Sequence, residues 1–211
     1  MKLIRALILL GWLLPMAVAH PADMLVQAAY ITLSPKQVKI ELDLTAGELV
    51  AKDFLVQLDS NQDQNISAAE VQTLASVVLE NIVLRVNNTP VSLRLESSQS
   101  SEIEQIKLGG GQVQLVFVGV ISASSQNQFI FKNNFAPVNS GYLANVFVQS
   151  SAVKIISQQR DQTQQTFEVA YEVAESALPW VFPWWLGFIA VIGILLWFSR
   201  ARFGQVKALQ S

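Results

Sequence analysis

The chain has 211 residues, with 14 Lys and Arg against 16 Asp and Glu, and its formal net charge is −2. A charge this small gives no electrostatic reason to expect binding to nucleic acid. Because the chain contains no cysteine, disulfides, thiolate metal sites and a cysteine nucleophile are all excluded.

Residues 1–19 have the pattern of a secretory signal peptide. Basic residues precede an apolar run at residues 6–14, and Ala17-Val18-Ala19 supplies a small-residue cleavage site. The apolar run is short for a membrane span, so an uncleaved N-terminal anchor is the less favoured alternative. We expect cleavage after Ala19, which would make His20 the first residue of an exported protein.

Residues 20–173 are predicted to form one mainly β domain. In KQVKIELDL, residues 36–44, apolar and charged side chains alternate with the period of a strand. A hairpin-type turn is expected at Asn87-Asn88-Thr89-Pro90, and further strands are expected in QVQLVFVGV, FIFKN, LANVFVQ, AVKIISQ and TFEVAYEV. This series of short strands predicts an antiparallel immunoglobulin-like sandwich.

Residues 46–84 interrupt the alternation. Apolar residues recur at helical spacing from Ala46 to Leu58 and again from Ser67 to Leu84. Ser67 and Glu70 have the spacing of a capping box at the start of the second helix. We therefore predict a helix–loop–helix insertion inside the β domain.

The stretch between these two helices, DSNQDQNISAAE, matches the calcium-binding loop of an EF-hand. Calcium prefers six to eight oxygen ligands, and every ligand position of the loop can supply one. One of these oxygens is the backbone carbonyl at position 7. The predicted ligands at positions 1, 3, 5, 7, 9 and 12 are Asp59, Asn61, Asp63, Asn65, Ser67 and Glu70.

One position of the loop departs from the EF-hand pattern. Gln64 occupies position 6, where glycine normally turns the backbone through a positive φ, and a side chain there costs about 1 kcal/mol. No second, partner loop is found in the sequence. We therefore expect a weak structural calcium site, and the alternative is an ordinary helix cap with solvated acidic residues.

Other chemistry has less support in the sequence. His20 is the single histidine, so no Ser-His triad can form, and we predict that the protein is not an enzyme. A hydrolytic enzyme of unknown substrate is the remaining catalytic alternative. The amine and imidazole of His20 could bind a transition metal after cleavage, but one imidazole makes a poor site. A protein that handles nickel, cobalt or copper, through His20 or through the loop, is a second and less favoured alternative.

The segment at residues 131–149 is rich in asparagine. Asparagine side chains in turns usually bond to nearby backbone groups, so we expect this segment to fix loops in place. A surface that binds a partner is the alternative.

The sequence predicts a transmembrane helix at residues 180–198, after a linker at residues 174–179. The segment carries no charge, and its length suits a bilayer core of about 30 Å. Tryptophans lie near both ends, and three basic residues occur in the following tail, residues 199–211, which predicts a cytoplasmic C-terminus. A buried core helix is the alternative.

Several quoted segments resemble the exported N-terminal domain of the HupE/UreJ-type bacterial membrane proteins. They are Ala19-His20-Pro21, the DSNQDQNISAAE loop, Lys132-Asn133-Asn134 with Tyr142-Leu143-Ala144-Asn145, and Arg160-Asp161 with Gln164-Gln165. In that family the domain often precedes a multi-span portion associated with nickel or cobalt transport. A single predicted span replaces that portion here, so transport is not carried over.

The resemblance implies an accessory protein that works beside a membrane partner such as a metal permease. It also implies a single-pass protein of the bacterial inner membrane with its domain in the periplasm. Together with the loop, this predicts a membrane-anchored, calcium-binding interaction module.

Overall fold

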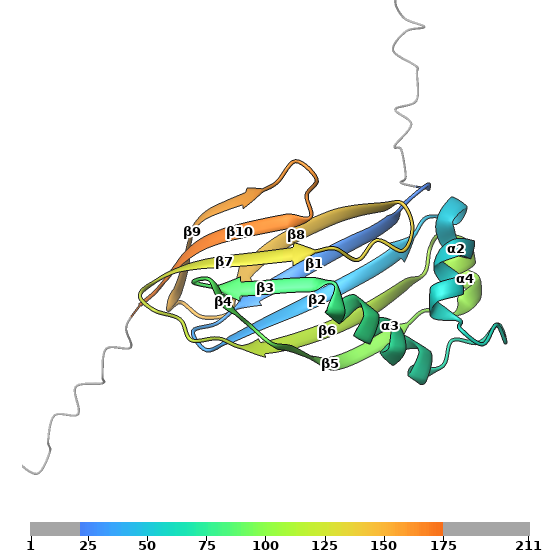
Figure 1. Cartoon of the computed structure of the whole chain (residues 1–211), viewed down its shortest axis with the longest axis horizontal. Helices are drawn as coiled ribbons and strands as arrows, with labels where there is room; N and C mark the ends of the chain where they lie inside the picture. The colour runs from blue at the N-terminus through green and yellow to red at the C-terminus, as the bar shows by residue number, and fades with distance from the viewer. Residues whose placement is uncertain (1–21, 175–211) are drawn as a thin grey trace, which may run out of the picture. The chain divides into compact units, whose positions relative to one another are not determined.

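Ten strands form two sheets in residues 22–174, the part of the chain that this computed structural model describes (Figure 1). The mainly β, two-sheet prediction is confirmed. The predicted signal peptide, His20, the transmembrane segment and nearly all of the linker lie outside the described residues. Within the described residues, no helix is both long enough and apolar enough to cross a bilayer.

The first sheet has five strands in the order β5-β6-β2-β1-β8. All its neighbours are antiparallel except β1 and β8, which run parallel with Leu25 opposite Ser140 and Leu33 opposite Val148. The strands are β5 (Leu93–Ser100), β6 (Gln112–Val120), β2 (Gln37–Ala46), β1 (Leu25–Leu33) and β8 (Ser140–Val148). The expectation of a purely antiparallel sandwich is thus wrong at this pair. Alternation reveals which face of a strand is buried but not the direction of its neighbour.

The second sheet also has five strands, all antiparallel, in the order β4-β3-β7-β10-β9. They are β4 (Thr89–Pro90), β3 (Ile82–Val86), β7 (Gln126–Asn133), β10 (Thr166–Val173) and β9 (Val153–Arg160). The Asn87-Asn88 turn has the two positive φ angles of a tight hairpin, 51° and 64°. The returning strand is only β4, however, because the chain from Leu93 onward joins the other sheet beside β6.

The core consists of the inward residues of both sheets. Along β2, Val38, Ile40, Leu42 and Leu44 are fully buried, as the alternation predicts. Each such side chain contributes about 1.5–3 kcal/mol when it leaves water. The hydroxyl of Tyr171 is also buried and has no hydrogen-bond partner, and burial raises the pKa of this phenol to about 12.

Three helices lie at one end of the sheets: α2 (Glu48–Leu58), α3 (Ala68–Glu80) and α4 (Ile103–Lys107) (Figure 1). The helix–loop–helix prediction is confirmed, but its second helix was predicted too long. Helix α3 ends at Asn81, whose side chain donates to the Val77 carbonyl, and Ile82 begins β3. Helical spacing alone could not reveal that the following β-branched residues pair with β7.

The asparagine-rich segment ties β8 to its surroundings. The amide of Asn133 donates to Gln27 Oε1 at 2.8 Å, and Gln27 donates to the Phe135 carbonyl at 2.7 Å. The Phe135 N–H returns a bond to Asn133 Oδ1 at 3.0 Å, and both amide side chains are buried. The Tyr142 hydroxyl donates to the Phe135 carbonyl at 2.9 Å. The expectation that these asparagines fix loops is therefore confirmed for Asn133.

Replacing Asn133 should test this buried amide cluster. Asn133→Leu removes the partner of Gln27 Oε1 and of the Phe135 N–H, and unsatisfied buried groups of this kind cost about 1–3 kcal/mol each. We expect a loss of at least 1 kcal/mol in the free energy of unfolding, measured by urea denaturation. Asn134→Ala is the control, because this exposed residue bonds through its backbone N–H. Equal effects of the two substitutions would contradict the prediction.

Candidate functional site

The acidic loop connects α2 to α3 at the end of the sheets that carries the helices. Helix α2 ends as the Asp59 N–H donates to the Leu55 carbonyl at 2.8 Å. Asp59 and Glu70, the first and last predicted ligands, are only 6 % and 7 % exposed, whereas the residues at 60–65 are exposed. Burial of these two carboxylates means that the ends of the loop are held against the domain while its middle remains in solvent.

The carboxylate of Asp59 organises the first half of the loop. Its Oδ1 accepts the Asp63 N–H at 3.2 Å, and its Oδ2 accepts the Gln64 N–H at 3.1 Å. Asn61 Oδ1 accepts the same Asp63 N–H at 2.9 Å, and Asp63 Oδ1 accepts the Asn65 N–H at 2.8 Å. The oxygens of three predicted ligands therefore point inward, toward the backbone of their own loop.

The loop backbone turns where the EF-hand pattern requires it to turn. Gln64, at position 6, has a φ of 63°, and Gln62 has a φ of 58°. Non-glycine residues seldom adopt this left-handed conformation, which costs about 1 kcal/mol for most side chains. The positive φ expected at Gln64 is thus observed, and the residue carries the strain that glycine would avoid.

Glu70 closes the loop by joining its end to its beginning. The capping box is confirmed: Ser67 Oγ accepts the Glu70 N–H at 3.3 Å, and Glu70 Oε2 accepts the Ser67 N–H at 3.0 Å and the Ser67 hydroxyl at 2.8 Å. Its Oε1 accepts the Asn61 N–H and the Ser60 hydroxyl, each at 3.3 Å. These donors, first the Ser67 N–H and then its hydroxyl, lower the pKa of Glu70 to about 2.

The arrangement brings the oxygen donors into one loop, but the side chains do not form a finished cation cage. In residues 22–174, no three His, Cys, Asp or Glu side chains converge as metal ligands. The four bonds that Glu70 accepts occupy about all the acceptor positions of a carboxylate, and Asp63 Oδ2 accepts the Asn61 amide at 2.9 Å. A bound cation would have to displace hydroxyl and amide donors from these oxygens.

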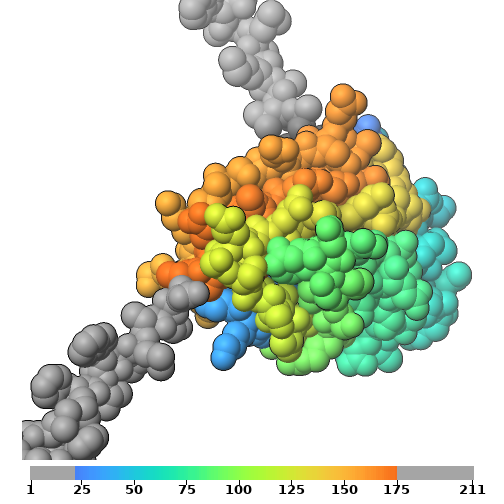
Figure 2. Space-filling model, turned by 60° about the vertical axis from the view of Figure 1, so that its left-hand side comes forward, coloured from blue at the N-terminus to red at the C-terminus, as the bar shows by residue number. Residues whose placement is uncertain are grey.

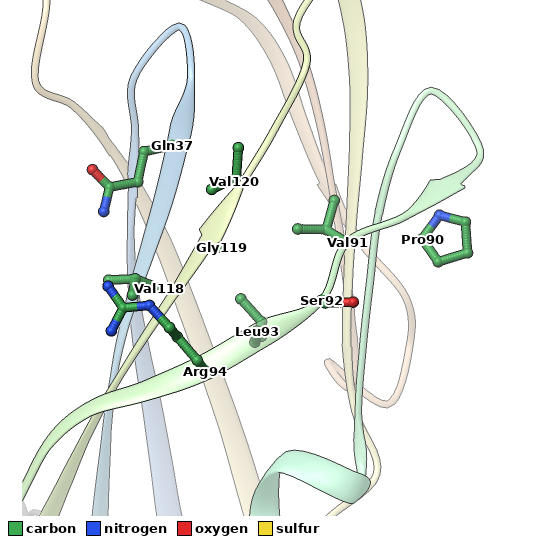
Figure 3. Close-up of a pocket in the computed structure, with 9 residues that line it drawn as sticks. All are labelled: Gln37, Pro90, Val91, Ser92, Leu93, Arg94, Val118, Gly119 and Val120. Atoms are coloured by element: carbon green, nitrogen blue, oxygen red, sulfur yellow. The ribbon is translucent and has the colours of Figure 1, made fainter.

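Two hollows mark further surfaces that sequence reasoning missed. One lies beside the loop, between α2 and α4, where Asp59, Gln62 and Gln64 contribute to its wall. The other, of about 500 Å³, lies where β5 and β6 meet the segment after β4 (Figure 3). Neither could be predicted, because each is formed by elements that are distant in sequence. Apolar residues at strand and helix positions that face solvent are the one sequence feature that indicates such surfaces, and they do not show where a hollow lies.

No family model matches the chain, and no curated protein matches it. The resemblance to exported HupE/UreJ domains therefore stays a prediction that depends on the quoted segments alone.

The low pKa of Glu70 predicts how acid affects stability. A carboxylate whose pKa is lowered by folding stabilises the folded state at any pH above its pKa in the unfolded chain. For Glu70 this stabilisation is lost as the pH falls from about 4.5 to about 2. Glu70→Gln should lower the melting temperature at pH 7, and the difference from wild type should shrink toward pH 2. The control Glu80→Gln, at an exposed carboxylate on the same helix α3, should change neither curve. If the difference in melting temperature between Glu70→Gln and wild type stayed constant between pH 7 and 2, the lowered pKa of Glu70 would be refuted.

Proposed function

We propose that the protein is a non-enzymatic, membrane-anchored periplasmic module whose β domain carries one weak structural calcium site. The observation that supports the calcium site best is the closed loop. The Asp59 carboxylate gathers the N–H groups of two loop residues, Gln64 adopts a positive φ at position 6, and Glu70 reaches back to Asn61. A short solvated turn ahead of a helix would need only the Ser67–Glu70 pair.

The ligand set favours calcium over other cations. All six predicted positions offer oxygen, which suits a hard cation, and none offers the nitrogen or sulfur that nickel and copper prefer. Calcium also tolerates irregular coordination, whereas magnesium demands a near-ideal octahedron. Because Gln64 is strained and Glu70 is already fully bonded, we expect a dissociation constant of about 10⁻⁴–10⁻³ M, the range of extracellular modules.

In this role calcium would hold the helical cap on the sandwich. The loop joins the end of α2 to the start of α3, so a cation bound to both of its ends would restrain the two helices together. Binding at ten times the dissociation constant would add about 1.4 kcal/mol to the free energy of unfolding. Such a site stabilises a surface and does not carry out chemistry.

The remaining parts of the proposal come from the sequence. The apolar segment at residues 180–198 supports a single-pass anchor in the bacterial inner membrane, and the leader supports export of the domain. The resemblance supports an accessory role beside a membrane partner such as a metal permease. We infer that the fold is immunoglobulin-like in its layers, because two five-stranded sheets stack around one core.

Calorimetric titration separates calcium from the competing cations. We expect Ca²⁺ to bind at submillimolar to millimolar concentration and to raise the melting temperature of the protein. Mg²⁺, Ni²⁺ and Cu²⁺ should bind more weakly and raise the melting temperature less. Asp59→Ala should abolish the effect, because it removes both a ligand and the acceptor for two loop N–H groups. The absence of a melting shift at 10 mM Ca²⁺ would refute the calcium site, and tight Ni²⁺ binding would favour transition-metal handling.

Two glycine substitutions distinguish a strained calcium loop from a strained turn. Gln64→Gly should relieve about 1 kcal/mol and tighten Ca²⁺ binding up to about fivefold, since more of the loop population would be competent to bind. Gln164→Gly is a matched control, because Gln164 has a φ of 59° in the turn between β9 and β10. It should stabilise the domain without changing calcium affinity. An equal change in affinity for both variants would contradict the loop assignment.

A further inference from the structure

One end of the sandwich, opposite the helices, gathers the turn at 34–36, the connection at 121–125, the turn at 149–152 and Ala174. We call it the exit end, because the last described residue, Ala174, lies there and 37 residues of the 211-residue chain follow. This end is at the left of Figure 1, and Figure 2 turns it toward the viewer. Backbone hydrogen bonds hold these segments together. They run from Ile121 to Lys36, from Gln149 to Leu33, from Val173 to Ser125 and from Ala174 to Ala152, at 2.8–3.2 Å.

The exit end is basic. Lys36, Lys39, Arg94 and Lys154 are all exposed, and within residues 22–174 the one salt bridge lies elsewhere, between Lys107 and Glu104. Lys39 and Arg94 both lie opposite Val118, so their side chains belong to one row across the outer face of the sheet. Against these four basic residues stand Glu172, opposite Lys154 in β10, and Glu41 and Glu96, each two positions farther from the exit end than Lys39 and Arg94 on the same strands.

The other end of the sandwich is acidic. It carries the helices, the EF-hand-like loop and the turn between β9 and β10, with basic residues in the minority. Its carboxylates are Asp23, Glu48, Asp53, Asp59, Asp63, Glu70, Glu80, Glu102, Glu104 and Asp161. A chain with a formal net charge of only −2 therefore has charges of opposite sign at the two ends of its β domain.

Apolar side chains are exposed beside the basic residues. Val120 is 82 % exposed, Phe147 51 % and Val148 46 %, and all three lie at the last or next-to-last position of their strands. The hollow of Figure 3 lies here, and the figure shows the apolar side chain of Val120 and the basic side chain of Arg94 among those that line it. Exposed apolar groups mixed with unpaired basic ones are typical of a surface that meets lipid headgroups.

We propose that the exit end rests on an anionic phospholipid bilayer, with Lys36, Lys39 and Arg94 against the phosphates and Val120 in the interface. The occupant follows from charge complementarity and from the point at which the chain continues toward the apolar segment at 180–198. This inference rests on the proposed membrane anchor and adds an orientation to it. The acidic end is repelled by the same surface, so the loop is held away from the membrane.

The absence of cysteine allows this orientation to be read from single labels on the full chain. The chain is reconstituted into nanodiscs, and a nitroxide is placed by Ser122→Cys at the exit end or by Gln162→Cys at the acidic end, both exposed positions. We expect the label at 122 to be protected from a water-soluble relaxation agent in anionic nanodiscs and less protected in zwitterionic ones. The label at 162 should remain accessible in both.

A charge-matched pair of variants tests the residues themselves. Replacing Lys36, Lys39 and Arg94 with Gln should abolish the protection, since each basic residue is expected to strengthen surface binding about fivefold and the three together about a hundredfold. Replacing Lys52, Lys107 and Lys132 with Gln changes the net charge equally and should leave the protection intact. Protection that is independent of lipid charge, that survives the first triple substitution, or that occurs without lipid would overturn the proposal.

The test also distinguishes failure of the anchor from failure of the surface. A chain that a high-salt wash removes from nanodiscs lacks the anchor, which refutes that part of the proposed function. In that case the label at 122 is read with added anionic vesicles, and protection there still supports the surface. A chain that resists the wash but leaves the label at 122 fully accessible refutes the surface alone.

Discussion

The parallel pairing of β1 with β8 determines which features lie at which end of the domain. Strand β1 runs from the helical end to the exit end, and every other strand pair in the two sheets is antiparallel. Because β8 runs in the same direction as β1, β9 returns to the helical end and β10 finishes at the exit end with Ala174. An antiparallel β8 would have brought Ala174 out beside the acidic loop.

Buried polar groups stabilise this pairing. Strand β7 ends and β8 begins at the helical end, and the segment at 134–139 joins them there. The Gln27–Asn133–Phe135 cluster fixes this segment to β1. Arg160 adds a second attachment, as its guanidinium donates to the Ala144 carbonyl and lies 5.0 Å from the Phe167 ring. Apolar packing alone would tolerate a shift of β8 by two residues, which keeps every side chain on its face, whereas the bond from Arg160 to the Ala144 carbonyl and the bond from Tyr142 to the Phe135 carbonyl would lose their partners.

Glu70 serves two structures that make different demands on one carboxylate. As a capping residue it satisfies the Ser67 N–H at the start of α3, and as the last loop residue it satisfies the Asn61 N–H near the loop's beginning. A calcium ligand at this position needs both oxygens free to face the cation. The same bonds that lower its pKa would therefore compete with calcium, and this competition is a physical reason, separate from the strain at Gln64, to expect the proposed site to be weak.

The sequence predicted the local features that depend on neighbouring residues. The strand alternation at residues 36–44, the Ser67–Glu70 capping box and the positive φ at Gln64 all follow from short-range chemistry, and the structure contains each of them. The errors concern partners that are distant in sequence. Ile82 continues the helical spacing of α3, yet it pairs with Asn133. Leu93 follows the predicted hairpin-type turn, yet it pairs with Gly119 in the other sheet.

The separation of charge could not be read from the sequence for the same reason. Lys39 and Arg94 are 55 positions apart, and they share a row only because β5 and β2 both pair with β6. The acidic residues of the opposite end likewise come from segments between Asp23 and Asp161. The formal net charge of the chain is the sum over both ends and is close to zero, so it does not show that the two ends carry opposite charge.

The proposed orientation also affects the calcium concentration that the loop would meet. An anionic bilayer enriches divalent cations only within about one Debye length, roughly 8–10 Å at physiological salt. A nine-residue strand such as β1 spans about 30 Å at 3.3 Å per residue, so the loop at the far end of the sandwich would lie outside this layer. The loop would respond to calcium in the surrounding compartment and not to the surface excess. Its weak affinity then suits a compartment in which calcium is millimolar, and a sandwich inverted on the membrane would lose this independence.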